Sequence, residues 1–543
     1  MAVLRLFARI PSHAMIRRLA AAALLALFAG GAIAGQPSEE IAGRLAQQSV
    51  IVAGQKLDVA TLRAAYERRQ YRPFWFAASG ADGSARALHA ALQDASREGL
   101  EPADYALPAI AERLNAPASE SRVDVELLLS AMLIHYSADL RHGRVAPRRA
   151  DPALFSQPRE IDAVAVIERV AASSDIQAEL RAMAPANPPY RRLRRALADY
   201  RKIVQRGGWQ RLAEGRPLKP GMQSADVAAL RERLAAGGWL TVESATPELF
   251  DSGLELALKQ FQRSHLLEAD GVLGDKTRAA LNVSAEERLR QIVLNMERWR
   301  WMPDDLGEFY VIVNMAAYEL EVVDAGSVRL AMRVVVGKPY RRTPVFSDRI
   351  RYLEFNPVWH VPVKIASQDL LPKEIADPGY LRRNGFRIFS GWTEEARELE
   401  PESIDWQQYR GQRLPLKLQQ SPGKKNALGR VKFMFPNVHD VYLHDTASPE
   451  LFDRTLRSFS SGCIRVEKPL ELATLLLRDT PGWTRPEIEI AIAGSSTRIA
   501  RLKAPVPVHL TYATVWLGEG GTLHFAPDVY DRDRALYRGL FNS

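Results

Sequence analysis

Two hydrophobic periodicities divide this chain. Before about residue 300, apolar positions recur every three or four residues, as in 85–98 and 124–140, and this spacing predicts amphipathic helices. After Phe309, apolar and polar positions alternate in short runs rich in β-branched residues, which predicts strands. We therefore expect a multidomain α+β protein in which helical domains precede a mainly β domain.

The helical part contains two predicted domains separated by Pro- and Gly-rich sequence. Residues 35–205 form a helical scaffold domain, and residues 216–283 form a smaller unit. Within the smaller unit we expect three helices, over residues 226–236, 252–265 and 277–281. Ser224 is the expected N-cap of the first helix, and Asp270-Gly271 predicts a tight turn before the last one.

A connector helix is predicted between the helical and β parts. Ser284 and Glu287 have the spacing of a capping box, and apolar residues then follow one face of a helix within residues 284–303. Residues 306–496 have the pattern of a mainly β domain, either a small sandwich or an open barrel. Its expected strands cover residues 309–314, 318–323, 328–336, 351–355, 432–436, 441–444 and 487–492.

Two stretches do not fit the predicted sheet. Residues 365–430 are rich in proline, glycine and charge, and an excursion of this length inside a β domain is typical of a functional lid or insertion. Residues 497–543 form a C-terminal segment with strand-like runs, for which the sequence suggests no function.

Net charge and the N-terminal sequence indicate where the chain acts. The 543 residues carry a formal net charge of +9, which favours polyanionic surroundings, but no Lys/Arg-rich block or nucleic-acid-binding motif accompanies it. Basic residues, the apolar run 19–29 and an Ala-x-Ala site at 32–34 predict a signal peptide over 1–34, with Gly35 starting the mature protein. The apolar run is shorter than the roughly 20 residues of a spanning helix. The sequence therefore predicts membrane attachment only through an uncleaved signal.

Cys463 is the single cysteine of the chain. In an exported protein it cannot form an internal disulfide, so its thiol is a candidate reactive group. The alternative is that Cys463 is a small buried hydrophobic residue, the common role of a lone cysteine. His135 and His142 are accompanied by no cysteine or acidic ligand cluster, so we expect structural roles for them and no metal site.

The sequence around this cysteine carries the main motif. It reads Tyr442-Leu-His444-Asp445-Thr446, followed after a short connection by Ser460-Ser461-Gly462-Cys463-Ile464-Arg465-Val466. This order resembles the active-site signature of the L,D-transpeptidases of bacterial cell walls, with every signature position filled. Residues 216–283 resemble the three-helix peptidoglycan-binding module. The stretches that resemble the scaffold region of large L,D-transpeptidases are 71–75, 98–105 and 139–147.

The resemblance implies thiol-based acyl transfer. Cys463 would be the nucleophile and His444 its general base, while the backbone N–H groups of Gly462 and Cys463 would stabilise the oxyanion. Arg465 would either hold a substrate carboxylate or brace the loop. His444 would be oriented by Asp445 or equally by a backbone carbonyl, since adjacent strand residues point to opposite faces. The residues expected to bind substrate are Tyr442, Ser461, Arg465, Trp359 and Asn356.

Members of this family act on the tetrapeptide stem of peptidoglycan. The resemblance implies that the thiolate attacks the third residue's carbonyl, that D-Ala leaves, and that a second stem's amine completes a 3→3 cross-link without metal or organic cofactor. It implies stem peptides and glycan strands as partners in the periplasm, no nucleic acid, and a thiol open to carbapenems. Large members carry a capping subdomain where residues 365–430 lie. Two alternatives stay open: a hydrolytic cell-wall thiol peptidase and an inactive peptidoglycan-binding scaffold.

Overall fold

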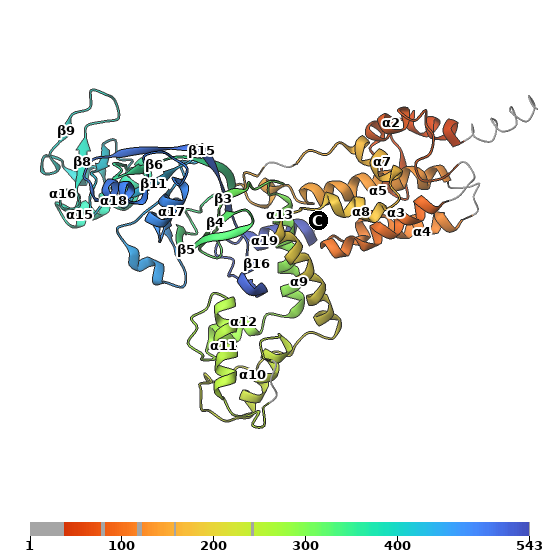
Figure 1. The fold of residues 1–543 in the computed structure, drawn as a ribbon, viewed down its shortest axis with the longest axis horizontal. Helices are drawn as coiled ribbons and strands as arrows, with labels where there is room; N and C mark the ends of the chain where they lie inside the picture. Colours follow the sequence, from red (N-terminus) through yellow and green to blue (C-terminus); the bar gives the residue numbers. More distant parts are fainter. Residues whose placement is uncertain (1–36, 78–81, 117–121, 157–158, 241–243, 542–543) are drawn as a thin grey trace, which may run out of the picture. The chain divides into compact units, whose positions relative to one another are not determined.

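Figure 1 shows the computed structural model, which describes residues 37–77, 82–116, 122–156, 159–240 and 244–541. These residues fall into two compact units. The first runs to Gly143 and resumes over Arg159–Ala186, and the second contains Arg144–Pro158 and the chain from Asn187 onward. The predicted signal peptide, residues 1–34, lies outside the described residues. Within them, no helix combines the length and apolarity needed to cross a membrane.

The first unit is a helical domain, as its hydrophobic period predicts. Its main helices are α2 (Val59–Glu67), α3 (Gly83–Gln93), α4 (Leu107–Asn115), α5 (Arg122–His142), α7 (Ala163–Ala172) and α8 (Ile176–Met183). A two-stranded hairpin, β1 (Ile51–Val52) and β2 (Gln55–Lys56), precedes them. α5 has buried residues on all of its faces, and Glu126 is one of them. Tyr66 donates its hydroxyl to Glu126 at 2.7 Å, and burial raises the pKa of Glu126 to about 7.

Three helices in the second unit form the small domain predicted over residues 216–283. They are α10 (Ala225–Ala236), α11 (Ser252–Ser264) and α12 (Asp275–Leu281), around a core that includes Leu230, Leu258 and Phe261. Ser224 is the N-cap residue of α10, although its hydroxyl makes no capping hydrogen bond. The tight turn forms as predicted: Gly271 has φ +74° and donates its N–H to Gln262 Oε1 at 2.9 Å.

The connector helix is α13 (Ala285–Arg300), and it packs along α9 (Pro188–Gln205). Ser284 and Glu287 form the predicted capping box. Further along α13, Glu297 and Arg300 form a buried ion pair of 2.7 Å, and Glu297 also accepts the N–H of Val145 at 2.9 Å. The helix is thereby tied to a chain segment far from it in sequence.

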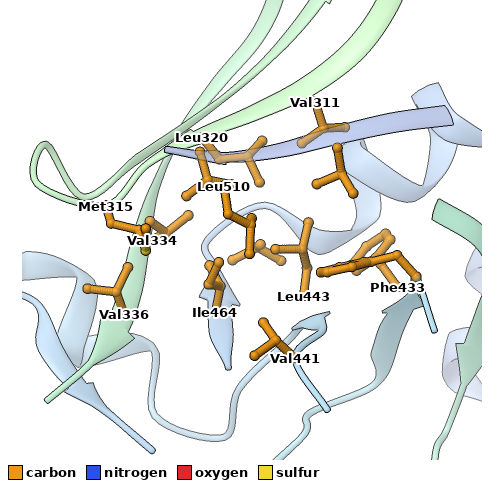
Figure 2. Packing of buried hydrophobic residues seen from close by; sticks show 14 of the residues in the cluster. Val311, Met315, Leu320, Val334, Val336, Phe433, Val441, Leu443, Ile464 and Leu510 are labelled. Atoms are coloured by element: carbon orange, nitrogen blue, oxygen red, sulfur yellow. The ribbon is translucent and has the colours of Figure 1, made fainter. Parts of the chain in front are cut away.

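A nine-stranded sheet forms the centre of the β domain, in the order β13-β5-β14-β12-β11-β6-β15-β3-β4. The strands are β3 (Phe309–Asn314), β4 (Glu319–Asp324), β5 (Ser327–Gly337), β6 (Phe346–Phe355), β11 (Val431–Met434), β12 (Leu443–His444), β13 (Ser458–Ser460), β14 (Ile464–Val466) and β15 (Arg498–Thr511). Because β4 also pairs with β5, the sheet closes on itself. Figure 2 shows its apolar interior, where Val311, Val334 and Leu510 come from strands distant in sequence.

Two sequence predictions about this sheet are wrong. Residues 487–492, expected as its closing strand, belong to helix α18 (Arg485–Ala493), because Ile488 and Ala491 are spaced to bury one helical face. Conversely, the sequence pattern predicts no strand of this sheet within residues 497–543, yet β15 lies between β6 and β3. The C-terminal segment then adds the hairpin of β16 (Val515–Leu517) and β17 (Leu523–Phe525) and the helix α19 (Arg532–Phe541).

The predicted insertion is a folded subdomain with a core of its own. Its sheet has the order β7-β10-β8-β9, with β7 (Trp359–His360), β8 (Phe386–Phe389), β9 (Glu398–Leu399) and β10 (Lys417–Gln420). Its helices are α14 (Val363–Ile365), α15 (Leu371–Ala376) and α16 (Tyr380–Arg383), with a π-helical turn at Ala366–Leu370. Leu381, Ile388 and Leu418 are fully buried in it. Tyr442 of the main domain packs against this core as well as its own.

Candidate active site

The signature residues come together because β12 and β14 are parallel neighbours. Leu443 pairs with Ile464, and His444 pairs with Arg465. Leu443 and Ile464 point into the apolar core, as Figure 2 shows. Side chains alternate along a strand, so His444, Arg465 and the preceding Cys463 lie on the other face. A strand spacing of about 4.8 Å and a rise of about 3.3 Å per residue put the Cα atoms of His444 and Cys463 about 8 Å apart.

The thiol of Cys463 is half-buried at the start of β14. Its Sγ lies 3.6 Å from the carbonyl oxygen of Asp440, to which the S–H can donate. Burial raises the pKa of the Cys463 thiol, while a hydrogen bond from the Tyr442 hydroxyl and the charge of Lys432 act in the opposite direction. The net result is a thiol that is protonated at neutral pH before any substrate is present.

His444 is held by a backbone carbonyl. Its Nδ1 lies 2.5 Å from the carbonyl oxygen of Asp445, so Nδ1 carries the proton and Nε2 is left as the basic nitrogen. The Asp445 carboxylate does not take part, because it accepts the N–H of Arg430 at 2.7 Å. Of the two orienting groups that the sequence left open, the structure therefore favours the carbonyl. Burial, and then the charge of Arg465, lowers the pKa of His444 to about 3.

The loop before Cys463 is shaped by Ser460. The Ser460 hydroxyl donates to the Cys463 carbonyl at 2.5 Å and accepts the Gly462 N–H at 3.1 Å. Gly462 has φ +125°, which a residue with a side chain rarely adopts. The expectation that the Gly462 N–H points to an oxyanion does not hold here, because Ser460 already occupies that donor. The Cys463 N–H remains our candidate donor.

Arg465 lies half-buried beside His444, and its Nε is buried without a hydrogen-bond partner among the described residues. Ser461 is exposed and accepts a hydrogen bond from Arg341 Nη1 at 2.8 Å. Tyr442 lies next to His444, with ring centroids 5.7 Å apart.

Asn356 and Trp359, two of the predicted substrate contacts, are buried side chains. Asn356 is fully buried and uses its amide inside the fold: it donates to the Ala491 carbonyl at 2.7 Å and accepts from Arg430 at 3.0 Å. Trp359 is buried in the core of the insertion, 6.1 Å from the ring of Phe386. Both residues shape the base of the insertion.

Two charged residues at the site were missed in the sequence. Lys432 lies on β11 directly opposite His444, and Arg341 joins Ser461 to the Asp369 carboxylate and to the Gln368 side chain at 2.9 Å. The alternation of strand 431–434 could have indicated Lys432, since it puts this residue on the polar face. No sequence signal could have indicated Arg341, because its partners come from the loop before Cys463 and from the π-helical turn of the insertion, which are distant in sequence.

Thr343 and Tyr530, the latter from the C-terminal segment, form hydrogen bonds that stabilise the loop carrying Cys463 and the end of β5. Thr343 donates its hydroxyl to the Gly462 carbonyl at 2.8 Å and accepts the Gly337 N–H at 3.0 Å. Tyr530, just before α19, donates to the Gly337 carbonyl at 2.6 Å. Among the described residues, no three His, Cys, Asp or Glu side chains lie close enough together to form a candidate metal site.

Three family models match the chain. Residues 308–490 match the YkuD model, described as an L,D-transpeptidase catalytic domain. Residues 223–281 match a "putative peptidoglycan binding domain", and residues 60–197 match a scaffold domain. The thiol and imidazole described above lie within the YkuD match. The β domain therefore matches the YkuD family of L,D-transpeptidase catalytic domains, in a chain that also matches a peptidoglycan-binding domain.

A curated relative supports this assignment. It is a "Putative L,D-transpeptidase" of Haemophilus influenzae, 36% identical over 256 residues, which are 47% of this chain and 50% of the relative. The chain thus spans about half the length of this relative. Among solved structures, an L,D-transpeptidase from Mycobacterium smegmatis is 14% identical, with a TM-score of 0.18 over 38% of this chain and 58% of the other. One from Xylanimonas cellulosilytica is 14% identical, with a TM-score of 0.17 over 55% and 99%. At TM-scores this low, neither structure supports an inference about the fold or the function of this chain.

Proposed function

We propose that this protein is an exported L,D-transpeptidase that forms 3→3 cross-links in peptidoglycan through an acyl-enzyme on Cys463. The observation that carries the proposal is the pairing of β12 with β14 inside a YkuD catalytic domain. This pairing puts the only thiol of the chain and a neutral imidazole on one face of the sheet.

Cys463 and His444 act as a neutral acid–base pair. The raised pKa of the thiol and the lowered pKa of the imidazole both disfavour a resting thiolate–imidazolium pair. His444 Nε2 therefore accepts the S–H proton while Sγ attacks the carbonyl carbon of the third stem residue. The Cys463 N–H stabilises the oxyanion that forms.

The remaining steps pass on each proton that His444 accepts. His444 gives the thiol proton to the leaving amine, so that D-Ala departs and a thioester remains on Cys463. The side-chain amine of a second stem then attacks the thioester, and His444 takes a proton from that amine and gives it to the departing sulfur, so that the thiol is restored as the new amide forms. Arg465, with its unpartnered Nε, is proposed to bind a substrate carboxylate.

Cell-wall binding and location are part of the proposal. The domain over residues 223–281 is proposed to hold glycan strands near the catalytic site. The predicted signal peptide over residues 1–34 would place the protein in the periplasm, attached to a membrane only if the signal stays uncleaved.

Product analysis with purified tetrapeptide muropeptides tests the proposal. Wild-type protein is expected to give tripeptide–tetrapeptide dimers and free D-Ala, and Cys463→Ala to give neither while it keeps the wild-type melting temperature. Intact mass should show one carbapenem adduct on the wild type and none on Cys463→Ala. Shortened monomers without dimers would indicate a hydrolytic thiol peptidase, and no product with no adduct would indicate an inactive scaffold.

A further inference from the structure

A row of charged residues crosses the catalytic sheet through His444. Lys432 on β11 pairs with Glu354 on β6 on one side and with His444 on β12 on the other. His444 in turn pairs with Arg465 on β14. Paired residues on neighbouring strands point to the same face and lie about 5 Å apart. His444 is thus flanked by one cationic residue on each side.

The ammonium group of Lys432 is held in place by two contacts. Its Nζ lies 3.6 Å from the Glu354 carboxylate and 4.3 Å from the centroid of the Tyr442 ring. The side chain of Lys432 is only 15% exposed, and that of Glu354 is 20% exposed. A charge with so little contact with water is weakly screened, so it acts on its neighbours more strongly than a surface lysine does.

We propose that Lys432 is a positioning residue of the catalytic centre, whose ammonium group adds to burial and to Arg465 in favouring the unprotonated form of His444, the form that accepts the proton of the Cys463 thiol. The inference rests on the proposed function, because it concerns the same proton transfer. It goes beyond that function by giving a role to a residue outside the signature motif.

Other groups that face His444 act on its protonation in both directions. On its own strand, His444 meets the Tyr442 ring and the Asp445 carbonyl, and the carbonyl of Leu428 reaches it from the end of the insertion. Both carbonyls favour the protonated form of His444. The Cys463 thiol is uncharged, and only its thiolate form would favour protonated His444 in the same way. Opposing them are burial and two charges, those of Arg465 and Lys432. Glu450 acts on Arg465, and Glu354 is the ion-pair partner of Lys432.

Lys432 acts on both members of the catalytic pair in the same direction. It lowers the pKa of His444 and also that of Cys463. The difference between the two pKa values, which sets the cost of moving the proton, therefore changes little. What Lys432 changes is the pH range over which His444 is available as a base. Because the pKa of His444 is lowered, this range extends further toward acid pH. The predicted signature of Lys432 is thus the position of the acid limb of the pH–rate profile.

The test compares variants of the full-length protein in their rate of acylation by a carbapenem, followed by intact mass from pH 3 to pH 9. Lys432→Met and Lys432→Gln remove the charge, and Lys432→Arg keeps it. Lys373→Met is the matched control, because Lys373 also lies over a tyrosine ring, that of Tyr380 at 5.3 Å, but inside the insertion. An imidazole NMR titration of His444 in the same variants reports its protonation without requiring activity.

We expect the acid limb and the His444 titration to move upward by about one to two pH units in Lys432→Met and Lys432→Gln. They should stay near the wild-type position in Lys432→Arg and Lys373→Met. The Gln variant keeps a hydrogen-bonding side chain and serves if the Met variant unfolds. Unmoved titrations in folded Met or Gln variants would overturn the inference, and so would an equal shift in Lys373→Met. If the proposed function itself fails, wild-type Cys463 is not acylated, whereas the His444 titrations still show whether Lys432 controls the imidazole.

Discussion

Thr343 donates its side-chain hydroxyl to the backbone carbonyl of Gly462 at 2.8 Å, and Thr343 is fully buried. The same oxygen accepts the N–H of Gly337 at 3.0 Å, at the end of β5. One hydroxyl thus satisfies a donor and an acceptor that would otherwise be buried without partners. It also fixes the peptide unit immediately before the proposed nucleophile.

Replacing Thr343 by valine keeps the volume of the side chain and removes the hydroxyl. We expect the free energy of unfolding to fall by about 1–3 kcal/mol, because two buried backbone groups lose their partner. Carbapenem acylation should slow several-fold, since the Gly462 peptide is no longer fixed. Thermal melting and acylation rates measure the two effects. Thr343→Ser is the control that retains the hydroxyl, and equal acylation rates in the Val and Ser variants would contradict the prediction.

Arg341 connects the nucleophile loop to the insertion, so it provides a test of the insertion as a lid. Its side chain is only 7% exposed, and it bonds Ser461 on one side and Gln368 and Asp369 on the other. Arg341→Gln should loosen the insertion without unfolding it, because the insertion has its own core. We expect more hydrolysis relative to amine transfer, since water reaches the thioester more freely.

The readout for Arg341→Gln is the ratio of cross-linked dimer to free tripeptide. Asp369→Asn breaks the same contact from the other side and should lower the ratio similarly, and the double variant should add little. Arg382→Gln is the matched control, because its ion pairs with Glu400 and Glu402 lie within the insertion. An unchanged ratio in both Arg341→Gln and Asp369→Asn would show that the insertion does not control water access.

The stability of the first unit should fall as pH rises, because of Glu126. Its folded pKa is raised from 4.5 to about 7, chiefly by burial. The folded state therefore binds more protons than the unfolded state between these values, and stability is fully present below about pH 4.5 and lost as pH rises through 7. The loss amounts to roughly 3 kcal/mol for a shift of this size. Denaturant unfolding of the full-length protein at pH 5 and pH 8 measures it, and Glu126→Gln should remove most of the difference. An unfolding free energy that does not depend on pH would contradict this reading of Glu126.

Ending the chain after residue 496 should prevent the catalytic domain from folding. The cut removes β15, which pairs with β6 on one edge and β3 on the other, and with it the buried residues Val508 and Leu510. We expect aggregated protein without carbapenem reactivity. A chain that ends after Phe541 is the control and should behave as wild type. A soluble, acylable 1–496 fragment would show that the sheet does not need β15.

The structure brings together Cys463 and His444, the two residues of the predicted motif, whereas parts of the sheet that carries them differ from the prediction. The motif identifies these residues because it records residue types at fixed positions on or beside two adjacent strands. Asn356 and Trp359 lie in a stretch that resembles the family equally well. What these side chains contact depends on their burial, and their burial depends on how the insertion folds around them. Lys432 and Arg341 belong to no motif, and their roles depend on register and on loops distant in sequence.

The strands were predicted well where alternation is regular and poorly where tertiary pairing decides. β15 has irregular alternation and a register shift between Arg501 and Val506, so its pattern does not identify it as a strand between two others. Residues 487–492 show the opposite error. Isoleucine and glutamate alternate there as in a strand, but Ile488 and Ala491 are buried on one face of α18 while Ile490 is exposed.

The place of β15 in the chain sets the order in which the catalytic domain can fold. Residues 498–511 form the last strand of the sheet in sequence, yet this strand lies between β3 and β6 and joins them. During synthesis or translocation, β3 must wait for about 200 residues before this neighbour emerges, because Val311 of β3 pairs with Val508 of β15. Pairings over such long separations form slowly. The half-formed sheet would meanwhile expose two unpaired edges and a free thiol, so we expect folding of this domain to be the step at which the protein depends most on chaperones.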